Sequence, residues 1–246
     1  MRQYGLIGFP LSHSFSKKYF TEKFQRENIR DAAFENFSIP EVDDIKALLQ
    51  NHPSLKGFAI TIPYKKTIIP YLDFITDEVK IMGACNCVKI TGNKLYGYNT
   101  DILGFEKSFV KKLKPHNISA LILGTGGAAM AVEFVLNKLN IPYHFVSRND
   151  NAAKNIFSYA DLNATLMNTH SIIINTTPLG TFPGTEDAPE IPYELLTSNH
   201  YLFDLIYNPP LTKLMQLGLQ HNCTVENGYE MLALQAEENW KIWNEE

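Results

Sequence analysis

The sequence predicts an α/β protein made of two units, each built around a mainly parallel β-sheet. Strand and helix patterns alternate over the first hundred residues, and a second, separate alternation begins at Ser119. Short and almost wholly apolar runs such as Gly57–Ile62 are typical of parallel strands that are buried on both faces. We expect residues 1–102 and 229–246 to form the first unit and residues 103–228 the second, which is an ordinary size for each.

Composition and charge narrow the classes of protein to which the chain can belong. It is 45% hydrophobic and 20% charged, as a soluble globular protein would be, and its net charge of −4 argues against binding to nucleic acid or a membrane surface. The N-terminus leads directly into a strand without a signal-peptide pattern. Cys85, Cys87 and Cys223 lack the spacing of metal ligands, so we expect reduced thiols, no metal site and a cytoplasmic location.

The first unit opens with a buried strand at Tyr4–Phe9, followed by a polar loop and a helix with an aromatic face. The loop carries Ser12, Ser14 and Ser16. One hydroxyl would suffice to cap the helix, whereas three hydroxyls in five residues would also suit a polyhydroxylated ligand. Both interpretations stay open at this point.

The end of the strand Gly57–Ile62 carries the next candidate residues, because ligands of parallel sheets bind beyond the carboxyl ends of the strands. Thr61, Lys65 and Lys66 lie there. A lysine pair at a turn is usually solvated, but an inward-facing, partly desolvated lysine has a lowered pKa and can exchange a proton with a substrate. Asn86 lies among apolar residues and must find hydrogen-bond partners in the backbone or in a ligand.

The segment Lys94–Asp101 reads as a strand, a turn and the start of a helix. Asn99 or Thr100 can cap that helix through a side-chain oxygen. Asp101 would lie in the first turn, where the helix dipole favours an anion, so a capping role would explain it. Asp101 also lies where the two units join, and ligand clefts form preferentially at such joints.

The second unit begins with a strand that runs directly into a glycine-rich turn and a helix. Gly124, Gly126 and Ala129 match the pattern G-x-G-x-x-G/A in the strand–turn–helix context that a dinucleotide site requires. The glycines allow the backbone to approach a pyrophosphate, and the helix N-terminus supplies amide groups. After the next strand, Arg148 suits the 2′-phosphate of NADP, while Asp150 keeps NAD open.

Later segments add polar residues at strand ends and on the last helix. Tyr207 follows the strand Tyr201–Asp204, where proline stops the strand. In the last helix Gly228, Met231 and Gln235 share a face, and Gln235 is either a boundary residue or an amide held toward a cleft. We expect the helix's two tryptophans, Trp240 and Trp243, to anchor it against the first unit.

Taken together, these motifs resemble the shikimate dehydrogenase family along nearly the whole chain. The matching segments are Ser14–Ser16, Ile60–Lys65, Gly83–Asn86, Gly97–Asp101, Gly124–Ala129, Asn175–Gly180, Asp204–Tyr207 and Gly228–Gln235. The resemblance implies an N-terminal substrate domain, a Rossmann domain that binds NADP, and the reversible reduction of 3-dehydroshikimate to shikimate in the chorismate pathway. It also implies that the last helix returns to the first domain.

The resemblance further assigns roles to individual residues. Lys65 and Asp101 would form the catalytic pair, with Lys65 donating a proton to the substrate oxygen or stabilising its charge. The substrate contacts it implies are Ser14, Ser16, Thr61, Lys65, Asn86, Asp101, Tyr207 and Gln235. The cofactor contacts it implies are Asp77, Gly124, Thr125, Gly126, Gly127, Ala128, Ser147, Arg148, Asn149, Thr176, Leu205, Gly228 and Met231.

The sequence departs from the family pattern at three places, and three other functions remain possible. Lys17 stands where the family usually has proline, and Asn227 replaces a more frequent aspartate. The usual Asn-Arg-Thr of the 2′-phosphate site is Ser147–Asn149 here, followed by Asp150. The rivals are an NAD-preferring quinate/shikimate dehydrogenase, a methylenetetrahydrofolate dehydrogenase and a nucleotide-binding sensor without activity. The loop with Ser14 and Ser16, together with Gln235, argues against the methylenetetrahydrofolate dehydrogenase, and the presence of both Lys65 and Asp101 argues against the inactive sensor. We expect a monomer or a homodimer.

Overall fold

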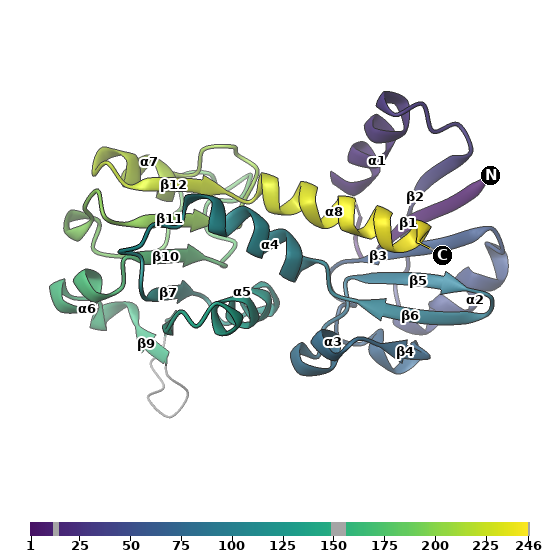
Figure 1. Cartoon of the computed structure of the whole chain (residues 1–246), viewed down its shortest axis with the longest axis horizontal. Coiled ribbons are helices and arrows are strands. Elements are labelled where there is room, and N and C mark those ends of the chain that lie inside the picture. The colour runs from purple at the N-terminus through teal and green to yellow at the C-terminus, as the bar shows by residue number, and fades with distance from the viewer. Residues whose placement is uncertain (12–14, 149–155, 246) are drawn as a thin grey trace. The chain divides into compact units, whose positions relative to one another are not determined.

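The computed structural model describes residues 1–11, 15–148 and 156–245, which divide into two compact units (Figure 1). The first unit comprises Met1–Asp101 with Gln235–Glu246, and the second comprises Ile102–Leu234. Each unit contains a six-stranded sheet, so the predicted α/β class with one sheet per unit is confirmed. The last helix, α8 (Tyr229–Asn244), begins in the second unit and ends in the first.

The sheet of the first unit has the strand order β2-β1-β3-β5-β6-β4. Its strands are β1 (Arg2–Gly8), β2 (Ala32–Ser38), β3 (Leu55–Ile60), β4 (Phe74–Ile75), β5 (Cys87–Thr91) and β6 (Lys94–Tyr98). Strands β1, β2 and β3 are parallel, whereas β5 runs antiparallel to both of its neighbours. Only two residues join β5 to β6, and a connection that short permits no parallel crossover. Gly92 provides the left-handed turn, with φ of 59°.

Both faces of this sheet are covered, which explains the apolar strands. The helices of the unit are α1 (Phe15–Arg26), α2 (Ile45–Asn51), α3 (Asp77–Met82) and the end of α8. One face packs Ile7 and Phe58 against α2 and α3, and the other packs Tyr4 against Phe20 of α1 and against α8. Trp243 stacks on Tyr4 with 5.2 Å between ring centroids, and its indole N–H donates to the Val88 carbonyl at 3.0 Å. The predicted anchoring role of the α8 tryptophans is thereby confirmed.

The second unit is a doubly wound parallel sheet of order β12-β11-β10-β7-β8-β9. Its strands are β7 (Ala120–Leu123), β8 (Tyr143–Ser147), β9 (Ile156–Ser158), β10 (Ile172–Asn175), β11 (Tyr201–Asp204) and β12 (Thr224–Asn227). Its helices are α4 (Asp101–Phe109), α5 (Gly127–Lys138), α6 (Ala164–Thr169), α7 (Lys213–Gln220) and the start of α8. The chain builds outward from β7 in one direction and then from β10 in the other. Ligands of such sheets bind where the order reverses, at the carboxyl ends of β7 and β10.

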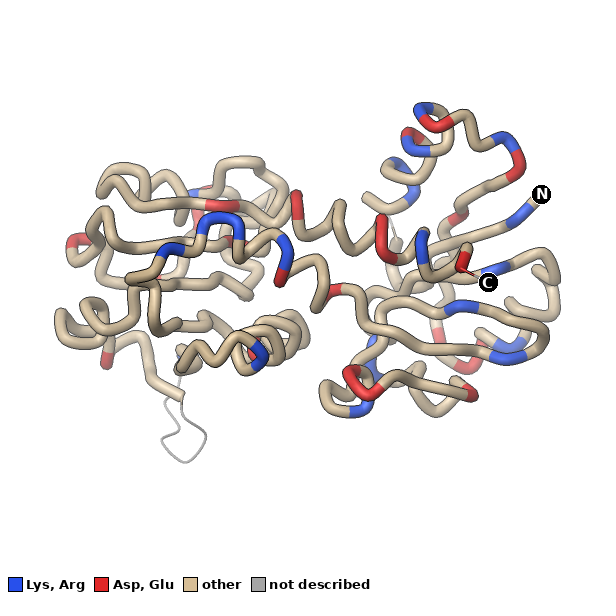
Figure 2. Tube along the Cα trace, viewed as in Figure 1, with Lys and Arg blue, Asp and Glu red and all other residues tan. Residues whose placement is uncertain are grey.

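Charged residues of both signs are interspersed along both units (Figure 2). Many form ion pairs, such as Lys138 with Glu106 at 2.7 Å. Exposed pairs contribute about 0–1 kcal/mol each, so the stability of the fold comes mainly from its apolar clusters. Among the described residues, no helix is both long and apolar enough to cross a membrane.

Gly57→Ala tests the packing of α8 against the first unit. A Cβ at position 57 would overlap the indole of Trp243, which is 5% exposed and has little room to move. We expect the substitution to lower the free energy of unfolding by about 1–3 kcal/mol, the usual cost of overpacking. Thermal or urea unfolding measures this change.

The exposed Lys56 on the same strand provides the control, because Lys56→Ala should change stability by no more than about 0.5 kcal/mol. Equal stability of Gly57→Ala and wild type would show that Trp243 is not packed against β3.

Candidate active site

The two residues predicted to form a catalytic pair are in contact within the first unit. Lys65 Nζ lies 2.7 Å from Asp101 Oδ2, and the two side chains are 33% and 20% exposed. Lys65 belongs to the turns that follow β3, and its carbonyl accepts the Cys85 N–H at 2.7 Å. The neighbouring Tyr64 is buried and donates its hydroxyl to the Ile39 carbonyl. These contacts hold the backbone of the turn, and the Asp101 carboxylate holds the lysine side chain.

Asp101 is the first residue of α4, yet it is not the residue that caps this helix. The Asn99 side-chain oxygen accepts the Asp101 N–H at 3.1 Å, while the Asn99 amide group donates to the Ala84 carbonyl at 2.9 Å. Asn99, one of the two residues predicted to cap this helix, therefore binds the first N–H of α4. The Asp101 carboxylate points to Lys65 instead, so capping alone does not explain the presence of an acid at this position.

A buried chain of hydrogen bonds includes two of the predicted substrate residues, Asn86 and Gln235. Asn86 is 3% exposed and contacts Thr100 through its side chain, and Thr100 contacts Asn239, which contacts Gln235. Asn239 is not among the residues predicted from the sequence to form the site. It stands four residues after Gln235 in α8, so the shared helix face was the available signal.

The remaining predicted substrate residues are distributed over both units. Ser16 lies in the first turn of α1 and is half-buried, whereas Ser14 lies outside the described residues. Thr61 directly follows β3, where its N–H donates to the Ile7 carbonyl. Tyr207 follows β11 in the second unit, where burial raises the pKa of its phenol.

The glycine-rich turn after β7 has the geometry of a phosphate-binding loop. Gly124 adopts φ of 99°, and a Cβ there would come within 3.0 Å of the Thr176 and Thr177 side chains. At Gly126 and Gly127 a Cβ would have no described heavy atom within 4 Å, so the backbone is open to a ligand. Gly126 is the N-cap of α5 and has no side chain that could cap the first turn. The Ala129 N–H donates to the Gly126 carbonyl at 3.1 Å, and the preceding amides of the turn can bind an anion.

Next to this turn the second unit contains a cavity of about 340 Å³. Its lining residues are Gly124, Thr125, Ser147, Arg148, Tyr159, Thr177, Pro178 and Leu179. Four of them were predicted to contact a cofactor, and they come from the ends of β7 and β8. The open glycines, the α5 N-terminus and one guanidinium fit a dinucleotide with an additional phosphate. Asn149 and Asp150 lie outside the described residues.

Several other predicted cofactor residues do not line this cavity. Asp77 belongs to the first unit, is 85% exposed and pairs with Lys80 at 2.7 Å, as a residue in the first turn of a helix often does. Gly228 lies against the Leu205 carbonyl so closely that any side chain would overlap it. Met231 follows in the first turn of α8, and Ala128 is exposed in the first turn of α5.

A buried carboxylate supports the wall of the cavity. Asp204 is fully buried at the end of β11 and accepts hydrogen bonds from Asn175, the Ile206 N–H and the Thr212 hydroxyl, the last at 2.6 Å. Asn175 in turn accepts the N–H and hydroxyl of Thr177, which lines the cavity. Burial raises the pKa of Asp204 to about 6, despite the three hydrogen bonds that lower it.

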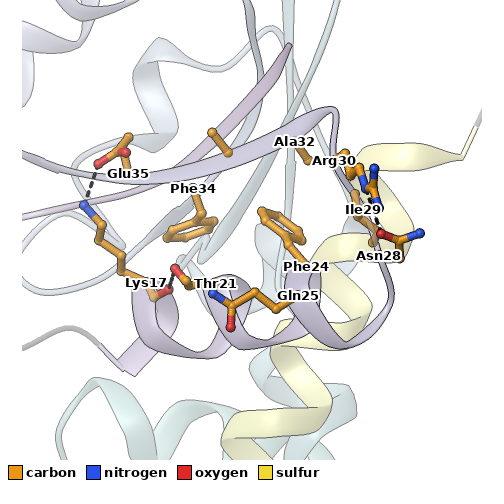
Figure 3. A pocket seen from close by; sticks show the side chains of 11 residues that line it. Lys17, Thr21, Phe24, Gln25, Asn28, Ile29, Arg30, Ala32, Phe34 and Glu35 are labelled. Atoms are coloured by element: carbon orange, nitrogen blue, oxygen red, sulfur yellow. Dashed lines mark hydrogen bonds and ion pairs between the residues drawn. The ribbon is translucent and has the colours of Figure 1, made fainter.

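A second cavity, of about 390 Å³, lies between α1 and β2 in the first unit (Figure 3). Lys17 and Glu35, on its wall, pair with each other at 2.6 Å. Arg30 donates to Asn28, and the Thr21 hydroxyl donates to the Lys17 carbonyl. Several polar groups of this cavity are thus engaged with one another, and none of the residues predicted to bind substrate or cofactor lines it.

A parallel sheet with a glycine-rich dinucleotide turn, in a chain that also holds a lysine–carboxylate pair, defines a nicotinamide-dependent dehydrogenase. Comparisons identify the family. Residues 6–88 match the model described as the shikimate dehydrogenase substrate binding domain. A shikimate dehydrogenase (NADP(+)) of Clostridium beijerinckii is 37% identical over 100% of this chain and 93% of its own. One from Staphylococcus haemolyticus is 36% identical over 98% and 92%.

Solved structures agree with the sequence comparisons. The chorismate mutase/shikimate 5-dehydrogenase fusion protein of Clostridium acetobutylicum has a TM-score of 0.88 at 30% identity, covering 99% of this chain and 91% of its own. The shikimate dehydrogenase of Aquifex aeolicus has a TM-score of 0.84 at 30% identity, with 99% and 92% covered. The chain belongs to the shikimate dehydrogenase family and is an oxidoreductase, which confirms the resemblance seen in the sequence.

Asp204→Asn tests the buried carboxylate behind the cavity. Its pKa in the folded protein, about 6, lies above the ordinary value of 3.8, so ionised Asp204 destabilises the native state. The destabilisation of the native state by ionised Asp204 is absent at pH values well below 3.8, increases as the pH rises through 6 and is constant above that pH. The stability of Asp204→Asn relative to wild type should therefore increase by roughly 2–3 kcal/mol between pH 4 and pH 7.

Urea unfolding of both proteins across this pH range measures the difference. Parallel stability curves for the two proteins would show that Asp204 is not a destabilising buried charge.

Proposed function

We propose that this protein catalyses the NADP-dependent, reversible reduction of 3-dehydroshikimate to shikimate. The Lys65–Asp101 contact of 2.7 Å, partly shielded from solvent but still accessible, is the observation that carries the proposal. The curated relatives named above are shikimate dehydrogenases (NADP(+)), and they align with the whole of this chain or nearly so. A shikimate dehydrogenase solved in complex with NADP+ also has this fold, with a TM-score of 0.85 at 28% identity.

The chemistry requires a proton at one oxygen atom. When bound, NADPH supplies the hydride that adds to the ketone carbon. The carbonyl oxygen then gains negative charge and must receive a proton. Lys65 is an ammonium with three N–H donors, of which one is directed to Asp101. Another can donate to the substrate oxygen, and in the reverse reaction the neutral amine accepts the hydroxyl proton. Positioned proton transfer of this kind contributes roughly 10²- to 10⁴-fold to the rate.

Asp101 performs two tasks in this scheme. Its carboxylate holds the Lys65 ammonium in one orientation, and because it can accept further hydrogen bonds it can also bind a substrate hydroxyl. Ser16, Thr61, Asn86 and Gln235 supply neutral hydrogen-bonding groups in the same unit. We infer that these groups, with Ser14 and Tyr207, bind the carboxylate and remaining hydroxyls of shikimate.

NADP is the cofactor that the second unit favours. Arg148 lines the cavity beside the α5 N-terminus, and a guanidinium binds a phosphate through paired N–H groups. The case for an NAD-preferring quinate/shikimate dehydrogenase depends on Asp150, and the relatives' named cofactor argues against it. We further propose a cytoplasmic enzyme, because the three cysteines are free and buried, and a monomer or homodimer.

Lys65→Ala tests the proton-transfer role. We expect kcat with shikimate to fall by roughly 10²- to 10⁴-fold, because the substrate oxygen loses its proton partner, while the KM for shikimate changes much less. Steady-state absorbance of NADPH measures both constants.

Lys66→Ala is the matched control, since Lys66 is the exposed neighbour on the same turn and should leave kcat unchanged. Wild-type turnover by Lys65→Ala would remove Lys65 from the chemistry.

Arg148→Ala tests the cofactor assignment. Loss of a charge-assisted contact of about 1.5–3 kcal/mol should raise the KM for NADP roughly 10- to 100-fold. The KM for NAD, which lacks the 2′-phosphate, serves as the internal control and should change little. An equal rise for both cofactors would place Arg148 elsewhere than at that phosphate.

A further inference from the structure

We propose that Asn239 is a positioning residue that fixes the direction in which the Gln235 side-chain amide faces the substrate. The inference rests on the proposed function, because it concerns the same substrate site. It follows from a chain of hydrogen bonds whose direction is determined at one end by a backbone amide. All of its members belong to the first unit.

The chain of hydrogen bonds begins at Thr100, whose backbone N–H donates to Asn86 Oδ1 at 2.7 Å. A backbone N–H can only donate, so the atom of Asn86 that faces it must be the side-chain oxygen. The amide nitrogen of Asn86 is thereby directed to the Thr100 hydroxyl, to which it donates at 3.1 Å. The backbone thus sets the orientation of the Asn86 amide.

The Thr100 hydroxyl links the oriented Asn86 amide to α8. Its oxygen already accepts a hydrogen bond from Asn86, and it carries one hydrogen of its own. Asn239 Oδ1 lies 2.7 Å away, closer than Asn86 Oδ1 at 3.3 Å, so the hydroxyl hydrogen goes to Asn239. The Asn239 amide nitrogen must therefore face the other way, and it donates to Gln235 Oε1 at 3.3 Å.

The last step determines what Gln235 presents to a ligand. Its oxygen is turned toward Asn239, so its NH₂ group is turned away from Asn239. Gln235 is thus set to donate to substrate oxygens rather than to accept from hydroxyl groups. The members of the chain are 1–7% exposed, so water cannot readily replace a lost partner. If these hydrogen bonds only held α8 in place, Asn239→Asp and Asn239→Leu would raise the KM for shikimate equally.

Asn239→Asp separates the two roles. The introduced carboxylate can still accept from Thr100 and has nearly the same size, but when ionised it cannot donate to Gln235. Gln235 would then turn its NH₂ toward residue 239 and its oxygen toward the substrate. We expect the KM for shikimate to rise roughly 10- to 100-fold, with smaller changes in kcat and in the KM for NADP, since a contact present throughout the reaction is lost.

Protonation of the introduced carboxylate would restore a donor to Gln235, so the KM defect of Asn239→Asp should diminish as the pH falls. Asn239→Leu removes the constraint on Gln235 without reversing it and should raise the KM less than Asn239→Asp does. Lys241→Ala, at an exposed position of α8, is the control and should leave the KM unchanged.

Two results would overturn the inference: a wild-type KM in Asn239→Asp, or equal KM increases in the Asn239→Asp and Asn239→Leu variants. If Asn239→Asp does not fold, Thr100→Val decides, because it removes the hydroxyl that passes the direction to Asn239. That variant should raise the KM for shikimate several-fold, and an unchanged KM would refute the inference. Absence of shikimate oxidation in the wild-type protein would instead reject the proposed function.

Discussion

The contact between Lys65 and Asp101 is the interaction on which the proposed chemistry depends. An exposed ion pair would be screened by water and loosely oriented, whereas a fully buried one would cost several kcal/mol in desolvation. This pair lies between those limits, at 33% and 20% exposure. The charges are close enough to orient each other and open enough for a substrate oxygen to reach them.

The surrounding structure keeps these two side chains in place by satisfying the backbone around them. The turn that carries Lys65 is hydrogen-bonded to Cys85, and Asn99 accepts the first N–H of α4. Because Asn99 binds this N–H, the Asp101 carboxylate remains available to Lys65. In the second unit too, the backbone conformation forms the site. The left-handed Gly124 and the uncapped start of α5 form the phosphate site, while Asp204 and Asn175 support its wall from behind.

Local features were predictable from the sequence, and long-range ones were predictable only in part. The turn Gly124–Ala129 and the contact of Asn99 with the start of α4 are encoded by adjacent residues, and the structure contains both. The antiparallel direction of β5 was not anticipated, although its two-residue turn determines it. The proximity of Lys65 and Asp101, which are 36 residues apart, came from family resemblance rather than periodicity. Asn239 was overlooked because a polar residue on an amphipathic helix resembles a boundary position until its buried partners are known.

A crystal structure of the protein with bound shikimate and NADP+ would show whether Lys65 reaches the reacting oxygen. We expect Lys65 Nζ to lie within hydrogen-bond distance, about 2.7–3.2 Å, of the hydroxyl oxygen that is oxidised. Asp101 should contact both Lys65 and a substrate hydroxyl. A substrate bound with that hydroxyl turned away from Lys65, toward other side chains or bulk water, would show that Lys65 is not its proton partner.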